Sequence, residues 1–149
     1  EELEATPWAG QVLALRVECG DGHCGVDLDG PRGRPIVAVA AGVVTRVEIS
    51  ESGRDGRSGR YVRIAHADGV TTAYMHLDQI VPGIAVGDSI AAGQLLGTLG
   101  ATGVKSAEPH LHFQMTVPHK GGERFIDPTP YLHRATIAPN PNRASRVGW

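Results

Sequence analysis

The sequence predicts an all-β domain built from two packed antiparallel sheets. Short runs rich in Val, Ile, Leu and Ala alternate or cluster as strands do, and segments rich in turn-forming residues separate them. The 149 residues include 20 glycines and 10 prolines, a content typical of a chain with many turns. No helical period persists for three turns. A chain of this length fits one domain with its own core.

The strand candidates share apolar, often β-branched residues bounded by turn formers. Gly42 interrupts the longest run and predicts a bend or bulge there. Residues 67–69 (Ala-Asp-Gly) place glycine for a bulged hairpin, and glycines between 87 and 100 mark further short strands. The polar segment Ser50–Arg60 is expected to be a loop. The candidates are Gln11–Val17, Ile36–Ile49, Tyr61–His66, Val70–Leu77 and Leu111–Val117, the last strand that the pattern predicts.

Charge and hydropathy exclude some classes of protein. A formal net charge of -2 gives no electrostatic case for a nucleic-acid partner. The longest apolar run, Ile36–Val44, has the length of a strand, so no transmembrane segment is expected. We expect one domain over residues 11–133, an N-terminal extension over 1–10, and a loosely attached C-terminal tail over 134–149.

Cys19 and Cys24 lie five residues apart across a glycine-containing segment. This spacing allows a small disulfide loop in an oxidising compartment, or two free thiols in a reducing one. The glycines permit a tight turn, and they favour the disulfide.

Two of the seven histidines stand close together in His110-Leu111-His112. Residues at i and i+2 of a strand share a face, so Leu111 and Phe113 point the other way, into the core. The two imidazoles could both bind a metal, or one could be a ligand and the other a catalytic group. Alone, a His-x-His pair is more often an ordinary surface pair.

A second pattern is His23-Cys24-Gly25-Val26-Asp27, in which His23 and Asp27 share a face at i and i+4. Gly25 lies between them and leaves space for a metal or a substrate. With one histidine of the His110/His112 pair, they form a His2Asp set with an open fourth position. Three protein ligands with an open position are typical of catalytic zinc.

A third pattern is Tyr74-Met75-His76-Leu77, whose alternation places His76 on the same face as Tyr74. The Tyr74 hydroxyl is a possible substrate contact or a structural group. His76 alone would be an ordinary half-buried histidine. The three patterns together favour a metalloenzyme, since the chain has no Gly-x-Ser-x-Gly elbow, phosphate loop or HExxH helix.

In order, these segments resemble the signature motifs of the M23 (LytM/lysostaphin-like) metallopeptidases. The resemblance continues through Gly87-Asp88 and the segment Ala92–Gln94 to Asp127–Leu132, and it spans about residues 11 to 133. No signature position is missing. The motifs are His23-x-x-x-Asp27, Tyr74-x-His76-Leu77 and Pro109-His110-Leu111-His112-Phe113.

The resemblance implies that His23, Asp27 and His112 bind one Zn²⁺ per chain, and that His76 and His110 are unligated catalytic histidines. It also implies a β-sheet groove of the duplicated hybrid motif type, with zinc at its floor. The activity implied is hydrolysis of peptide cross-links or bridges in bacterial peptidoglycan through a zinc-activated water. Either catalytic histidine could accept the proton of that water while the other stabilises the oxyanion.

The resemblance further implies an extracytoplasmic protein, which is periplasmic, wall-associated or secreted. We expect a monomer. The opening residues Glu1–Glu4 do not resemble a signal peptide. Arg54, Arg57 and Arg60 could meet a carboxylate of a stem peptide, but the glycines around them favour a solvated loop.

Two other classes of protein remain. A non-catalytic LytM-like regulator or wall-binding domain would typically lack a ligand or a catalytic histidine, and none is missing here. The segment Gly87–Gln94 resembles part of the biotinyl or lipoyl carriers and of a sugar-phosphotransferase domain. The biotinyl and lipoyl carriers need a lysine at a hairpin tip, usually beside Met, Asp or Ala, and Lys105 and Lys120 lack that setting.

Overall fold

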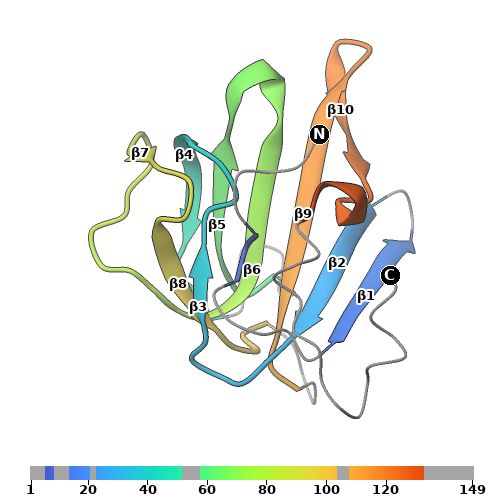
Figure 1. The fold of residues 1–149 in the computed structure, drawn as a ribbon. Coiled ribbons are helices and arrows are strands. Elements are labelled where there is room, and N and C mark those ends of the chain that lie inside the picture. Colours follow the sequence, from blue (N-terminus) through green and yellow to red (C-terminus); the bar gives the residue numbers. More distant parts are fainter. Residues whose placement is uncertain (1–5, 9–13, 21–22, 52–57, 104–107, 133–149) are drawn as a thin grey trace.

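A computed structural model of the chain describes residues 6–8, 14–20, 23–51, 58–103 and 108–132 (Figure 1). For residues 14–16, 18–20, 23 and 24 it describes the backbone only. Strands make up almost all of the regular structure in these ranges, with two short 3-10 turns. No described helix is long and apolar enough to cross a membrane.

Ten strands of the described residues join in one antiparallel sheet. The main path runs β1-β2-β9-β6-β5-β4-β7, with β10 beside β9 and with β3 and β8 branching from β6. In Figure 1, β9 lies between β6 and β2. The elements are β1 (Ala14–Gly20), β2 (His23–Asp29), β3 (Pro35–Val37), β4 (Gly42–Glu48), β5 (Arg60–Ala65), η1 (Ala67–Gly69), β6 (Thr71–Ile80), β7 (Ser89–Ile90), β8 (Leu95–Leu99), β9 (His110–His119), β10 (Gly122–Ile126) and η2 (Thr129–Tyr131).

The all-β antiparallel prediction is confirmed, but the strands do not form two separate sheets. The first half of β6 pairs with β5 and β9, and its last residues pair with β8. β6 therefore connects two branches of one sheet, one that contains β5 and β9 and one that contains β8 and β3. The buried apolar residues of both branches form one core. Its largest fully buried side chains are Tyr74, Phe113, Ile36, Ile64, Leu77, Leu96 and Leu111.

The structure differs from the predicted strands at the run Ile36–Ile49 and at β10. The run Ile36–Ile49 divides into β3 and β4, and residues 38–41 connect them. Gly42 begins β4, and a Cβ there would collide with the Ala65 carbonyl oxygen, so close backbone approach explains this glycine. β10 (Gly122–Ile126) has no strong apolar pattern and was not predicted.

The predicted boundaries at residues 10 and 134 remain predictions. Trp8, inside the expected N-terminal extension, is buried in the core and bridges Ile36. Residues 134–149 and Gln11–Leu13 lie outside the described residues. The β1–β2 register sets Cys19 opposite Cys24, but their side chains lie outside the described set, so the disulfide also remains a prediction.

A chain of hydrogen bonds, exposed at Ala41 and buried at Thr72 and Tyr74, ties the β3–β4 connection to β6. The His66 ring donates from Nδ1 to the Ala41 carbonyl (2.8 Å), so Nε2 of the neutral ring accepts from the Thr72 hydroxyl (2.7 Å). The Tyr74 hydroxyl then donates to Thr72 Oγ1 (2.8 Å) and accepts from the Val39 N–H (3.1 Å). With a neutral His66 ring, each link has one possible direction. Sequence reasoning gave His66 no role, and the structure makes it the end of this chain.

Thr72→Val tests the hydrogen-bond chain with little change in shape. It would leave the Tyr74 hydroxyl and His66 Nε2 without their central partner. An unsatisfied buried polar group costs about 1–3 kcal/mol, and the free energy of unfolding from urea titration should fall by about that amount. Thr45→Val is the matched control because the Thr45 hydroxyl is exposed, and its effect should stay within about 0.5 kcal/mol. Equal effects of the two changes would contradict the role of the chain.

Candidate functional site

The pairing of β2 with β9 places Asp27 directly opposite His112. Directly opposed residues of an antiparallel pair point to the same face of the sheet. His112 Nδ1 and Asp27 Oδ1 are 2.7 Å apart, and both side chains are largely buried, with exposed fractions of 14% and 7%. Two of the three predicted metal ligands are therefore in contact, although they lie 85 residues apart in the chain.

Gly25 makes room for the His112 ring. A Cβ at Gly25 would lie 2.8 Å from both Cε1 and Nε2 of His112, and 3.0 Å from the Phe113 carbonyl oxygen. The sequence predicted free space for a metal or substrate at this glycine. In the structure the imidazole itself fills that space, so the missing side chain sets where the ring can lie.

The third predicted ligand, His23, begins β2, four residues before Asp27 in the same strand. Its side chain lies outside the described set, so its predicted role is untested. Among the side chains that the structure does describe, no group of three or more His, Cys, Asp or Glu residues is arranged to hold a metal ion.

His76 lies at a β-bulge in β6. Arg60 pairs with Leu77 and Val62 pairs with Tyr74, so Met75 and His76 together face the single residue between Arg60 and Val62. His76 has φ 68°, a left-handed conformation that non-glycine residues adopt only where their surroundings enforce it. The bulge interrupts the alternation of β6, so the His76 side chain does not point to the face that alternation predicts.

The prediction that Tyr74 and His76 share a face was therefore wrong. The Tyr74 ring packs against Phe113 in the core (centroids 5.3 Å apart) and is fully buried. His76 instead packs beside His110 (centroids 4.9 Å) and His112 (6.1 Å). Burial raises the pKa of Tyr74, and its hydroxyl is already part of the hydrogen-bond chain described above. The structural interpretation of Tyr74 fits, and we propose no substrate contact for it.

The backbone holds the His76 ring in one tautomer. Its main-chain N–H donates to the Ser58 carbonyl (3.0 Å), and ring Nδ1 donates to the Thr102 carbonyl (2.8 Å). Burial, followed by the neighbouring His110 and His112, lowers the pKa of His76 to about 4. The ring is thus neutral near pH 7, and Nε2 carries the lone pair.

His110 is oriented in a similar way. Its Nδ1 donates to the Glu108 carbonyl (2.9 Å), and its main-chain N–H donates to the Gly100 carbonyl (3.0 Å). Only 8% of His110 is exposed, and the same is true of His76. The structure therefore brings together four of the five predicted chemical residues, and two of them keep Nε2 free of backbone contacts.

Thr102 positions His76, and the sequence analysis missed it. Besides its carbonyl contact with the His76 ring, its hydroxyl donates to the Leu77 carbonyl (2.7 Å) and accepts from the Arg60 N–H (3.0 Å). A Cβ at Gly59 would collide with the Thr102 backbone, so the two segments lie in direct contact. The signal in the sequence that could have indicated this role is a hydroxyl residue just before Gly103, in the segment that leads to the histidine pair.

Thr102→Val should loosen this support without removing its carbonyl. The Leu77 carbonyl and the Arg60 N–H would lose their partner, at a cost of about 1–3 kcal/mol in the free energy of unfolding. We expect the His76 ring to lose its single tautomer, which ring ¹⁵N chemical shifts report, and Thr102→Ser to restore it. An unchanged His76 tautomer in Thr102→Val would show that the hydroxyl does not position the ring.

Comparisons with known proteins identify the family of the chain. The model of "Peptidase family M23" matches residues 21–128. Lysostaphin of Staphylococcus simulans is 35% identical over 138 residues, which are 87% of this chain and 26% of lysostaphin. The DD-carboxypeptidase/endopeptidase Mpg of Neisseria meningitidis serogroup B is 39% identical over 95 residues, 64% of this chain and 20% of Mpg. A zinc-containing peptidase of Vibrio cholerae superposes with a TM-score of 0.66 at 26% identity, covering 86% of this chain and 39% of that one.

The chain thus spans about a quarter or less of the length of these curated relatives. The family match covers most of the chain and includes all five predicted chemical residues. The chain belongs to peptidase family M23.

Proposed function

We propose that this domain is a zinc-dependent endopeptidase that hydrolyses peptide cross-links or bridges of bacterial peptidoglycan. The observation that carries the proposal is the contact between Asp27 and His112, with the neutral His76 and the His110 ring beside it. The name of one relative supports the reaction class, since Mpg is a DD-carboxypeptidase/endopeptidase. Because its substrate is the cell wall, the protein would act outside the cytoplasm.

The residues present fit a zinc ion. Carboxylate and imidazole groups are typical zinc ligands, and Asp27 and His112 offer one of each at 2.7 Å from one another. Gly25 supplies the cradle that the His112 ring requires. With His23 as the third ligand, the set would be His23, Asp27 and His112, one ion per chain. When bound, zinc would act as a Lewis acid that polarises the scissile carbonyl and lowers the pKa of a water molecule.

His76 and His110 would act as the protein's proton-transfer groups. Each ring donates Nδ1–H to a backbone carbonyl, so each presents Nε2 for exchange with the reacting groups. One would accept the proton of the attacking water at Nε2 and then deliver that proton to the leaving amine, and the other would stabilise the oxyanion when its Nε2 is protonated. Their burial keeps bulk water from competing for these nitrogens.

The alternatives are less well supported. A non-catalytic regulator has no need for two buried histidines with fixed tautomers next to the ligand pair. Lys120 does lie in the β9–β10 hairpin turn, with φ 46°, contrary to our expectation for a carrier lysine. Its neighbours are His119 and Gly121, so the carrier setting is still incomplete.

Variants at the histidines separate metal binding from catalysis. His112→Ala should lose both bound zinc and the release of cleaved cross-links from purified peptidoglycan. His76→Ala and His110→Ala should each lower turnover by about 10²- to 10⁴-fold with zinc content unchanged, because they remove proton transfer only. Atomic spectroscopy and muropeptide analysis measure the two properties on the same samples.

The matched control is His119→Ala, an exposed histidine at the end of β9, which should leave both properties intact. Full turnover in His76→Ala would remove that residue from the mechanism. Zinc-loaded protein that cleaves no type of wall would support the regulator, and no zinc uptake at all would refute the proposal.

Gly25→Ala tests the cradle on the metal alone. The new methyl group would push the His112 ring away from Asp27, and changes in such supporting positions typically weaken metal binding by about 10- to 100-fold. Competition with a chromophoric chelator measures the loss. Gly122→Ala is the matched control, since its Cβ would meet only the His119 carbonyl at 3.7 Å, and it should bind zinc as the wild type does. Wild-type affinity in Gly25→Ala would contradict the cradle.

A further inference from the structure

A polar hollow lies on the same face of the sheet as the histidines, further along β9. His112 pairs with Met75, and two residues on, Gln114 pairs with Ala73. Two residues of a strand span about 7 Å, which is also the length of about two residues of extended peptide. A peptide whose scissile bond lies at the histidines would therefore place a residue one or two positions away over this hollow.

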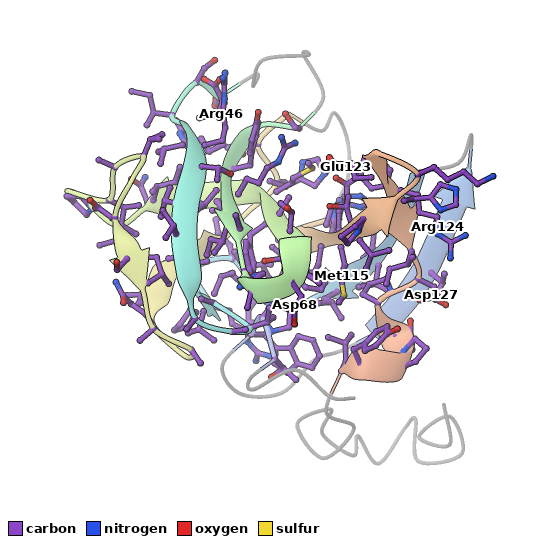
Figure 2. The ribbon with its side chains drawn as sticks, turned by 90° about the horizontal axis from the view of Figure 1, so that it is seen from above. Arg46, Asp68, Met115, Glu123, Arg124 and Asp127 are labelled. Atoms are coloured by element: carbon purple, nitrogen blue, oxygen red, sulfur yellow. The ribbon has the colours of Figure 1, made fainter. Side chains whose placement is uncertain are left out.

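The hollow is a shallow, open depression with about 20 Å³ of enclosed space, so a ligand group would lie across its mouth between the walls. Four strands provide the walls, and Figure 2 labels Glu123 on the β10 side. The wall residues that matter here are Arg63, Ala73, Gln114, Thr116, Glu123 and Phe125.

One wall of the hollow carries the guanidinium group of Arg63. Among the described residues, neither the half-buried Arg63 side chain nor the Gln114 amide has a hydrogen-bond or ion-pair partner. The nearby arginines are engaged: Arg46 binds Glu48 (3.1 Å), and Arg60 donates to the carbonyls of Ile49 (3.1 Å) and Asp78 (3.0 Å). Of Arg54, Arg57 and Arg60, which the sequence offered for a carboxylate while favouring a solvated loop, the first two lie outside the described residues and Arg60 is engaged, and the structure offers Arg63 instead.

The opposite wall is acidic. Glu123 accepts one hydrogen bond, from the Thr116 hydroxyl at 3.3 Å, and is otherwise exposed to the hollow. A guanidinium and a carboxylate that face one space without pairing favour a ligand group that carries both charges. The α-amino carboxylate of an amino acid is such a group.

Building on the proposed function, we propose that this hollow binds the α-amino carboxylate end of a diamino dicarboxylic acid side chain in the substrate peptide. Arg63 receives the carboxylate in a forked pair of hydrogen bonds, Glu123 receives the ammonium group, and the Gln114 amide lies between them. A glycine bridge has neither charge, so the hollow selects stem peptides of the diaminopimelate type over glycine bridges.

Two synthetic stem tetrapeptides test the proposal, L-Ala-γ-D-Glu-X-D-Ala with X as meso-diaminopimelate or L-lysine. They differ by one carboxylate at the end of the X side chain. Isothermal titration calorimetry on the metal-free chain should show tighter binding of the diaminopimelate peptide by about tenfold or more. Arg63→Gln should make the two affinities equal, and Arg63→Lys should keep part of the difference. Glu123→Gln should weaken both peptides alike, because they share the ammonium group.

Arg124→Gln is the matched control, since Arg124 is exposed and lies next to Glu123 on β10 (Figure 2). Arg124 does not line the hollow. It should keep the wild-type preference, and thermal unfolding checks that every variant is folded. Equal wild-type binding of the two peptides, or a preference that survives in Arg63→Gln, would overturn the proposal.

Cleavage is measured separately on diaminopimelate-type and glycine-bridged walls. Selective binding without cleavage of either wall would refute the peptidase while leaving the hollow's specificity in place. Cleavage without selective binding would refute the hollow's role while leaving the peptidase in place.

Discussion

The antiparallel pairing of β2 with β9 is the constraint on which the whole site depends. It sets Asp27 opposite His112 and brings Gly25 against the ring. A slip of one residue would turn these side chains to the core face and bring Leu111 and Phe113 out of the core. Those two residues are completely buried, so the apolar core enforces the register that the chemistry requires. The packing of β9 in the core therefore also fixes the geometry of the site.

The bulge at Met75–His76 adds the second half of the site. It turns a catalytic candidate away from the core, which a regular strand could not do without also turning out Tyr74. The left-handed backbone at His76 costs about 1–3 kcal/mol, and contacts from Ser58 and Thr102 offset it. Because of the bulge, β6 places Tyr74 in the core and His76 in the site. The segment around residues 100–103 supports His76 in its strained conformation.

Sequence periodicity predicted those parts that follow regular strand geometry. The shared faces of His110 with His112, and of Gly25 with Asp27, needed only alternation. Alternation failed at Tyr74 and His76, because a bulge depends on tertiary contacts that the local pattern does not contain. Alternation also failed to predict β10, because that strand is short and polar. The wall of the hollow that β10 provides was therefore not predicted either. Which residue of the histidine pair faces Asp27 came from the family resemblance, since the β2–β9 register is a long-range property.

The proposed function requires that Asp27 and His112 hold a metal ion together with His23. Crystals of the zinc-loaded chain, measured on both sides of the zinc absorption edge, test it most directly. We predict one anomalous peak per chain within bonding distance of the Asp27 carboxylate, His112 Nδ1 and the His23 ring, with His76 and His110 unbound. A peak at other residues, or none in zinc-saturated crystals, would contradict the account.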